Sequence, residues 1–248
     1  MVTVKSEKEI ELIKESCKIV RDALAFAGSK IKAGMSTKEV DELIERYIRS
    51  YGAYPSCLGY GGFPASACVS VNEVVVHGIP SHSQILKDGD IVSLDTVAYK
   101  NGFHGDAART FLVGNVDEEV QKLVRVTEEC FFKATEGLKA GTPLYDIGYK
   151  VQTHAESHGY GVIRSYTGHA IGREMHEDPS VPNFGRKGTG MRLKAGMVLC
   201  VEPMIAMKNW RVKVLDDDWT AVTVDGLPAA HYENTLVIRE DGVEILTL

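Results

Sequence analysis

Four carboxylates and one histidine in this sequence lie in apolar surroundings, where ionisable side chains are costly unless they have partners. Asp95 and Asp106 lie within residues 91–113, IVSLDTVAYKNGFHGDAARTFLV. Glu202 follows the apolar run VLCV, Glu233 lies just before TLVI, and His169 lies in the glycine-flanked run TGHAIG. Taken singly, each glutamate is equally well read as a structural ion pair, and the histidine as a hydrogen-bonded structural residue. The five together indicate a metal site.

The two aspartates lie on either side of a hairpin turn, because Asn101-Gly102 separates two apolar segments and Asn-Gly is a strong hairpin signal. A turn centred between residues 100 and 101 would place Asp95 directly opposite Asp106. A turn with Asn101 and Gly102 at its centre would place Asp106 opposite Val97. Both registers put the carboxylates on one face, since strand side chains alternate with a period of two. Like charges so close need a proton or a cation between them, so the stretch by itself fits a metal site or a solvated edge hairpin.

Four carboxylates and an imidazole at one place indicate a pair of divalent cations. The anions would repel one another strongly without them. Oxygen-dominated ligation with one histidine suits Mn²⁺, Fe²⁺ or Co²⁺, with Zn²⁺ as a further option. Two ions that share carboxylates would lie about 3.5–4 Å apart and activate a bridging water as a nucleophile.

Composition narrows the class of protein. The chain has 248 residues, 44% hydrophobic and 25% charged, which is typical of a globular protein and argues against disorder. Its net charge of −6 and the absence of a basic stripe argue against nucleic-acid binding. Five cysteines without CxxC spacing favour reduced thiols in the cytoplasm. The start of the sequence has no apolar signal core, and no apolar run is long enough to span a membrane.

Capping signals predict four helices. A capping box is formed by Ser6 with Glu9, before a helix with an apolar stripe from residue 10 to 24. A second capping box is formed by Ser36 with Glu39, before a helix that ends at Gly52. Asp117 is expected to cap a third helix that ends at Gly141. Thr142-Pro143 is expected to begin a fourth helix that runs to about Gly159. Strands are expected at residues 68–77, 161–169, 197–207, 210–215, 220–224 and 229–238.

A repeat at a constant offset indicates a duplicated fold. The run KAG at residue 32 recurs at 139, Gly52 matches Gly159, and LKDG at 86 matches LKAG at 193, each 107 positions apart. At that offset Asp95 falls on Glu202. Chance is the alternative, since each match is short. We predict an α+β fold of two helix–helix–hairpin halves, about 1–115 and 116–248, in a single catalytic domain with the acidic residues at the seam.

The five ligands, in this order and spacing, resemble the dinuclear site of the type I methionine aminopeptidases, which have the pita-bread fold, an antiparallel sheet covered by helices. The matching segments are residues 72–80, 95 with 105–106, 167–169, 174–179, 202–204 and 231–235. The resemblance covers nearly the whole chain and fits the short bacterial form. It implies that the protein removes the initiator methionine when the second residue is small.

The resemblance also implies roles for the site residues. Asp95 would chelate one metal ion, Asp106 and Glu233 would bridge both, and His169 and Glu202 would complete the other. Glu202 would also shuttle protons. Two accessory histidines would assist, with His77 near the substrate amide and His176 stabilising the developing oxyanion. The methionine pocket would involve Cys57, Tyr60, Phe63, Cys68, Met175 and Trp219. An ordinary core is the alternative interpretation of that last set.

Two positions depart from the family pattern. Ala170 follows His169 where glycine is usual, which would restrict that loop. Met175 replaces an expected aromatic residue, which would soften the pocket wall. Neither change removes a ligand.

The nearest alternative is an Xaa-Pro aminopeptidase or prolidase, which has similar ligands but usually an extra N-terminal domain. A non-catalytic binding member of the same fold is a less favoured alternative, because all five ligands are present. The expected partners are N-termini of nascent polypeptides, with a contact to the ribosome left open. We expect a cytoplasmic monomer with no specific nucleic-acid or membrane binding.

Overall fold

The structure, a computed structural model, describes residues 2–248. Helices α1 (Glu7–Gly28) and α2 (Thr37–Ser50) begin at capping signals that the sequence shows. The Ser6 and Ser36 side chains each accept a hydrogen bond from the N3 backbone N–H, and the Glu9 and Glu39 carboxylates accept one from the backbone N–H of the cap residue, so both capping boxes are present. The other helices are α3 (Glu118–Thr135) and α4 (Tyr145–Ser157), with a 3₁₀ turn η1 (Tyr60–Gly62).

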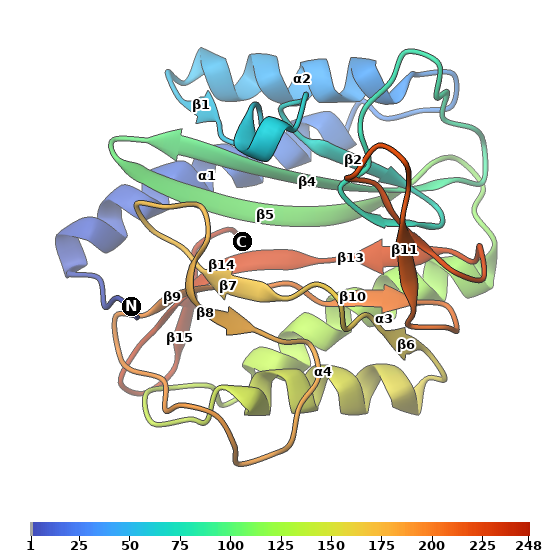
Figure 1. Cartoon of the computed structure of the whole chain (residues 1–248). Coiled ribbons are helices and arrows are strands. Elements are labelled where there is room, and N and C mark those ends of the chain that lie inside the picture. The colour runs from blue at the N-terminus through green and yellow to red at the C-terminus, as the bar shows by residue number, and fades with distance from the viewer. Residues whose placement is uncertain (1) are drawn as a thin grey trace.

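The strands of the described chain form one large antiparallel sheet and two small ones (Figure 1). The large sheet has the order β1-β4-β5-β14-β9-β7-β8, with β2 paired to β4 and β15 paired to β14. Its strands are β1 (Tyr54–Pro55), β2 (Cys68–Val71), β4 (Ile91–Lys100), β5 (Phe103–Leu112), β7 (Gly168–Ala170), β8 (Glu177–Val181), β9 (Val198–Val201), β14 (Glu233–Ile238) and β15 (Val243–Ile245). The small sheets join β13 (Ala229–His231), β10 (Met204–Ala206) and β6 (Gly161–Val162), and β11 (Val212–Val214), β12 (Ala221–Thr223) and β3 (Val74–Val76).

Each pair of helices packs on its own half of the sheet (Figure 1). Helices α1 and α2 share a buried cluster with Val92, Leu94 and Ala98 of β4. Asp95 and Val97, at the alternate positions of the same strand, line a pocket instead. Because side chains alternate along β4, one set of its side chains lies in the core and the other set lines the pocket.

Backbone hydrogen bonds repeat between the halves at the offset of 107 residues. The Gly34 N–H donates to the Leu86 carbonyl at 2.8 Å, and the Gly141 N–H donates to the Leu193 carbonyl at 2.8 Å. Isolated bridges follow the same offset, Ser36 with Ile85 and Pro143 with Arg192. The predicted fold class, two helix–helix–hairpin halves with an antiparallel sheet covered by helices, is confirmed.

The hairpin adopts the second of the two predicted registers. Asp106 pairs with Val97, and Asp95 pairs with Ala108. Asn101 and Gly102 both have positive φ, of 51° and 88°, as the central residues of such a turn require. The two carboxylates are therefore diagonal neighbours on one face.

Two helix predictions were wrong at their ends. Helix α3 stops at Thr135 instead of continuing towards Gly141, because Glu136 is extended and Gly137 has a φ of 68°. Helix α4 begins at Tyr145 without a side-chain cap. The Thr142 hydroxyl accepts a hydrogen bond from the Lys139 N–H, so it serves the preceding turn.

Several predicted strands are in fact two strands with a break between them. Residues 197–207 break at Glu202-Pro203, where proline supplies no N–H for a ladder. Residues 229–238 break at Tyr232, residues 161–169 break after Val162, and residues 68–77 turn at Asn72, which has a φ of 52°. The strands predicted at 210–215 and 220–224 form, but are shorter, as β11 and β12.

Helix α1 crosses β5 at Gly105, next to Asp106. A Cβ at residue 105 would lie 2.4 Å from the Cys17 backbone nitrogen, and backbone cannot yield as a flexible side chain can. We expect Gly105→Ala to lower the free energy of unfolding by about 1–3 kcal/mol, the usual cost of overpacking a core. Denaturant unfolding would measure the change. Gly242→Ala is the matched control, since a Cβ there meets nothing within 4 Å and its φ is not positive; an equal loss in both variants would contradict overpacking as the cause.

Candidate active site

Neighbouring strands of the large sheet bring the carboxylates together. Ala108 of β5 pairs with Asp95 of β4 on one side and with Glu233 of β14 on the other. Cys68 of β2 pairs with Asp95 on its far side. Directly paired residues point to the same face of a sheet. One row across four strands therefore carries two carboxylates on either side of a small alanine, with a thiol at its end.

His169 and Glu202 reach the site from the second half. His169 lies on β7 opposite Cys200 of β9, and Glu202 follows β9 at its break before Pro203. The Asn183 side-chain amide donates to the Glu202 carbonyl at 2.8 Å, which holds the chain at this bend. Thr235 of β14 pairs with Cys200, and Glu233 and Glu202 each lie two positions from that pair, so their side chains keep to one face and line the same pocket.

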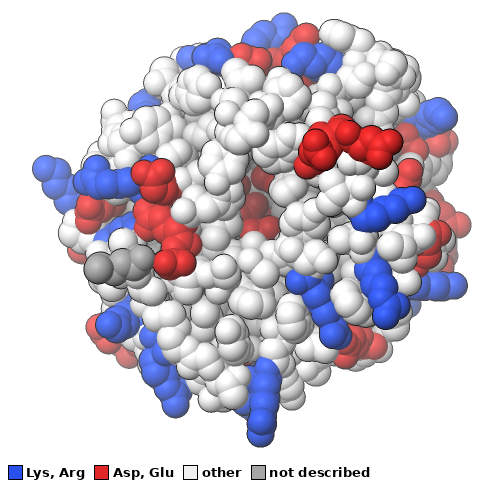
Figure 2. All heavy atoms as spheres, viewed as in Figure 1, with Lys and Arg blue, Asp and Glu red and all other residues white. Residues whose placement is uncertain are grey.

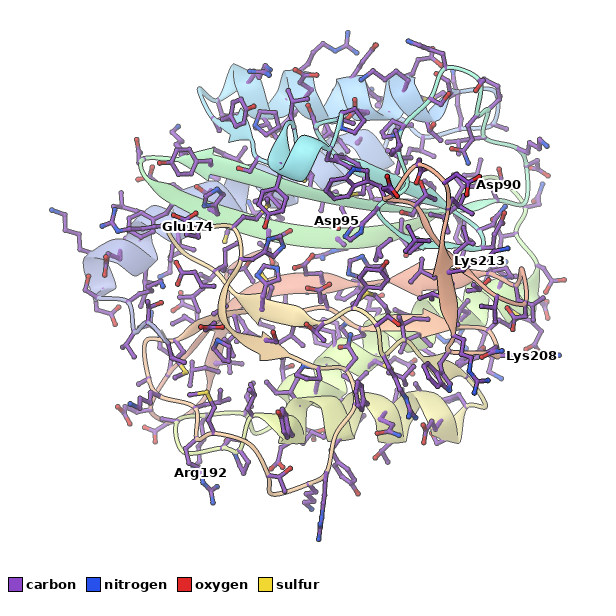
Figure 3. The ribbon with its side chains drawn as sticks, viewed as in Figure 1. Asp90, Asp95, Glu174, Arg192, Lys208 and Lys213 are labelled. Atoms are coloured by element: carbon purple, nitrogen blue, oxygen red, sulfur yellow. The ribbon has the colours of Figure 1, made fainter. Side chains whose placement is uncertain are left out.

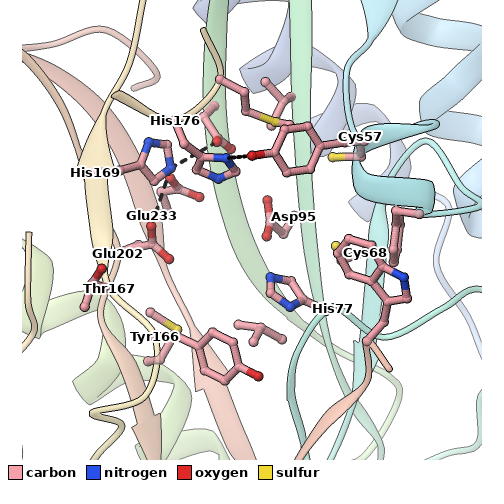
Figure 4. Close-up of a pocket in the computed structure, with 18 of the residues that line it drawn as sticks. Cys57, Cys68, His77, Asp95, Tyr166, Thr167, His169, His176, Glu202 and Glu233 are labelled. Carbon is pink, nitrogen blue, oxygen red and sulfur yellow. Dashed lines mark hydrogen bonds and ion pairs between the residues drawn. The ribbon is translucent and has the colours of Figure 1, made fainter. Parts of the chain in front are cut away.

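All of the sequence-predicted site residues line one pocket of about 320 Å³. Figure 2 shows acidic side chains at the bottom of a hollow in the middle of one face. In Figure 3 Asp95 lies in the interior, whereas Arg192, Lys208 and Lys213 point outward. The lining includes Cys57, Tyr60, Phe63, Cys68, His77, Asp95, Asp106, His169, Met175, His176, Glu202, Trp219 and Glu233 (Figure 4).

The His169 ring is oriented by a backbone hydrogen bond. Its Nδ1 lies 3.0 Å from the carbonyl oxygen of Ala170, which can only accept, so Nδ1 carries the proton. Nε2 then faces Asp106 Oδ2 and Glu202 Oε1, each at 3.7 Å, with its lone pair available (Figure 4). Ala170, the departure noted in the sequence, lies buried in β7 and leaves this arrangement intact.

Burial and mutual repulsion raise the pKa values of the carboxyl groups, so their ionised forms are unfavourable without a cationic partner. Burial raises the pKa of Asp106 well above its ordinary value, and the charges of Glu233 and Asp95 add to the effect. The pKa values of Glu202 and Glu233 are also well above the ordinary value, mainly through burial. Burial lowers the pKa of His169 to about 3, so this imidazole is neutral near pH 7. Neutral imidazole and carboxylate are the forms that bind metal ions.

Orphaned polar atoms show that the site fits divalent cations. Asp106 Oδ1 and Glu233 Oε1 are buried and have no hydrogen-bond partner among residues 2–248. Donor atoms of Asp106, His169, Cys200 and Glu233 lie within 4.8 Å of one another. Buried polar atoms are normally satisfied, so acceptors without donors indicate a place for a cation. Oxygen and imidazole donors suit a divalent transition metal.

The two accessory histidines occupy opposite sides of the pocket. His176 Nδ1 lies 2.7 Å from the Tyr60 hydroxyl, and its ring centre lies 4.3 Å from that of His169. His77 meets Tyr166 and Trp219 edge-on, with ring centres 5.3 Å and 5.9 Å away. His77 has a φ of 59°, a strained conformation for a residue with a Cβ. Burial lowers its pKa to about 4, so it is neutral near pH 7.

A soft apolar lining closes the end of the pocket at Cys57 and Trp219. Cys57, Phe63, Cys68, Val97 and Met175 form one buried cluster with Trp219 packed against it. Phe63 and Trp219 meet edge-on at 5.1 Å. The cluster is core-like, as the alternative interpretation held, and it also lines the pocket, so both descriptions apply. All five cysteines of the chain are free thiols.

Several residues at the site were not predicted from the sequence. His231 is buried, and its Nε2 lies 3.6 Å from Glu202 Oε2. It lies two positions before Glu233, a spacing that could have marked it in a strand. The Arg109 guanidinium donates to the Glu233 carbonyl and, at 2.6 Å, to Asn234 Oδ1, and so holds the start of β14 in place. Six further lining residues were not predicted as site residues: Val76, Val97, Ser165, Tyr166, Thr167 and Met204.

No helix of residues 2–248 is both long enough and apolar enough to cross a membrane.

Residues 11–240 match the model of metallopeptidase family M24. The chain is 51% identical over 248 residues to a methionine aminopeptidase of Clostridium acetobutylicum, and the match covers 100% of this chain and 99% of that protein.

Solved structures agree with the sequence relatives. A crystal structure of methionine aminopeptidase from Thermotoga maritima superimposes with a TM-score of 0.98 at 46% identity and covers 100% of this chain and 99% of that chain. A prolidase from Pyrococcus furiosus matches at a TM-score of 0.81 and 25% identity, and this chain spans 65% of it. The chain therefore belongs to metallopeptidase family M24 and, within it, to the methionine aminopeptidases.

Proposed function

We propose that the chain removes the N-terminal methionine from peptides and nascent proteins whose second residue is small. The observation that carries this proposal is one pocket with two ends. A soft lining of sulfur and aromatic side chains lies at one end, and four carboxylates with a neutral imidazole lie at the other. Sulfur–aromatic contacts contribute about 0.3–1.5 kcal/mol, which suits an unbranched thioether. The scissile amide of a bound N-terminal methionine would then lie next to the carboxylates.

Asp95, Asp106, His169, Glu202 and Glu233 would hold two divalent ions, Mn²⁺, Fe²⁺ or Co²⁺, with Zn²⁺ as a further option. The orphaned oxygens of Asp106 and Glu233 support bridging roles for these two residues. When bound, such ions supply Lewis-acid polarisation and an activated water. Asp95 would chelate one ion, and His169 and Glu202 would complete the other.

Glu202 would move the proton. Its carboxyl has a raised pKa, which suits a group that takes a proton from water and delivers it to the departing amine. The Nε2 of His231, at 3.6 Å from Glu202 Oε2, would help to hold that carboxyl in place.

His176 would donate to the developing oxyanion. A Tyr60 hydroxyl that donates to Nδ1 leaves the proton on Nε2, which is the tautomer that can donate from the other side of the ring. His77, held between Tyr166 and Trp219, would contact the substrate amide. Tyr60 and His77 line the same pocket, which supports a narrow second subsite between them.

The likeness to methionine aminopeptidases extends over the whole chain, so we further propose a single catalytic domain with halves at about 1–115 and 116–248. We also propose that it works as a monomer in the cytoplasm on nascent chains, with contact to the ribosome left open. Burial of the cysteines as free thiols is compatible with that compartment.

A substrate panel tests the function directly. We expect metal-loaded protein to cleave Met-Gly-X and Met-Ala-X peptides and to leave X-Pro-Y peptides nearly intact. Leucine or norleucine at the first position should be cleaved poorly but measurably, because one methylene of misfit changes selectivity by only about 10–200-fold. Lysine or aspartate there should fail. Preference for X-Pro-Y would favour the prolidase alternative, and no turnover of any peptide would favour a binding protein.

A further inference from the structure

A second group of metal-binding side chains lies on the paired helices α3 and α4, outside the pocket described above. Glu129 of α3 and His154 and His158 at the end of α4 each offer one donor atom, and these three atoms lie within 4.8 Å of one another. His154 and His158 are four residues apart, so they share one helix face. Their rings lie 4.9 Å apart, and none of the three residues lines the pocket.

The spacing of the donor atoms is close to what a tetrahedral ion requires. His154 Nε2 lies 3.0 Å from Glu129 Oε2. Ligands of Zn²⁺ at about 2.0–2.1 Å lie roughly 3.4 Å apart in a tetrahedron, so an ion could replace the proton between these two atoms. His158 is exposed and can rotate to supply the third donor. Water would complete the coordination.

The C-terminus of α4 favours a bound cation at this place, and the nearby Arg125 opposes it only weakly. His158 is the C-cap residue of α4, where the unsatisfied carbonyls of a helix carry partial negative charge. Arg125 lies 3.6 Å from Glu129, but it contacts Oε1 and leaves Oε2 towards His154. The side chains of Arg125 and Glu129 are 65% and 41% exposed, so this ion pair contributes little and can be displaced.

The other half of the molecule shows that the fold does not need these histidines. At the offset of 107 residues, Asp22, Tyr47 and Tyr51 occupy the matching positions on α1 and α2. The two tyrosine rings stack at 5.2 Å, and Asp22 accepts a hydrogen bond from Arg21 at 2.7 Å. The helix pair therefore forms with aromatic residues at these positions, which leaves the two imidazoles and the carboxylate available for another role.

We propose that Glu129, His154 and His158 form a second cation site, distinct from the catalytic centre, which binds Zn²⁺ or another borderline divalent ion such as Ni²⁺ or Cu²⁺. Two nitrogens and one oxygen exclude Mg²⁺ and Ca²⁺, which prefer all-oxygen ligation. Because its ligands come from both helices, an ion bound there ties α3 to α4.

The test is a calorimetric titration of Zn²⁺ into full-length protein whose catalytic centre is already saturated with Mn²⁺. Wild type is expected to bind one equivalent of Zn²⁺ more than His154→Ala, and this difference is independent of any exchange of Mn²⁺ for Zn²⁺ at the catalytic centre, where Zn²⁺ binds more tightly. His154→Ala and His158→Ala should each weaken this binding by at least about 10–100-fold, the loss that even an outer-shell partner causes. His82→Ala, which removes an exposed histidine elsewhere, should leave it unchanged.

A second probe identifies the ligands by a spectroscopic signal that does not depend on the calorimetric titration. One equivalent of Cu²⁺ added to wild type whose catalytic centre holds diamagnetic Zn²⁺ should show an electron paramagnetic resonance spectrum with coupling to two imidazole nitrogens, and to one in His158→Ala. Absence of the extra equivalent in wild type, or unchanged binding in His154→Ala, would overturn the proposal. Peptidase activity of the same samples should not change in these variants, so a failure here is distinct from a failure of the proposed function.

Discussion

Removal of divalent cations to near-zero content is expected to abolish peptide hydrolysis, and addition of Mn²⁺, Fe²⁺ or Co²⁺ is expected to restore it. The reason is electrostatic, because the described residues place no lysine or arginine side chain in the pocket lining to balance its four carboxylates. In the absence of cations, burial and repulsion raise the pKa values of Asp106, Glu202 and Glu233, so these groups take up protons more readily than ordinary carboxyl groups.

The measurement is turnover of a Met-Gly-X peptide against metal content by elemental analysis. Circular dichroism of the apo protein serves as the control for folding. Full turnover at a metal content near zero would show that the carboxylates act without cations and would refute the mechanism.

Asp106→Asn and His176→Ala are expected to fail in different ways. Asp106→Asn keeps the volume but removes a charge at the centre of the cluster, so we expect loss of at least one bound ion and of nearly all activity. His176→Ala removes a donor and no proposed ligand, so both ions should remain while the rate falls by about 10²–10³-fold. Metal content and kcat measured on the same samples separate the two outcomes.

The apo proteins give a readout of the Asp106 variant that does not depend on activity. Asp106 in the native state is buried beside Glu233 and Asp95, which raises its pKa and therefore opposes folding near neutral pH. Asparagine removes that repulsion, so the apo form of Asp106→Asn should melt at a higher temperature than the apo wild type. Equal metal loss in both variants, or a lower apo melting temperature for Asp106→Asn, would contradict the assigned roles.

The sequence alone determined the parts of the molecule that depend on local chemistry. Ser6 with Glu9 and Ser36 with Glu39 mark their helix starts, because a capping box satisfies orphan N–H groups within four residues. Asn101-Gly102 marks the hairpin turn for a similar reason, since few residue pairs tolerate two positive φ angles. The offset of 107 residues exposed the duplication, and all proposed metal ligands line the pocket.

Tertiary structure decided whatever depends on contacts between distant segments. The two hairpin registers were equivalent in sequence, and the register with Asp106 opposite Val97 appears only in the folded sheet. Strand breaks at Pro203 and Tyr232 interrupt the sheet next to Glu202 and between His231 and Glu233. A hydrophobic pattern does not reveal such breaks. His231 and Arg109 reach the site only through cross-strand packing, which local residue type does not specify. The chemistry of the ligands could therefore be predicted from residue types. The orientation of their side chains and the contacts that hold them could be known only from the folded chain.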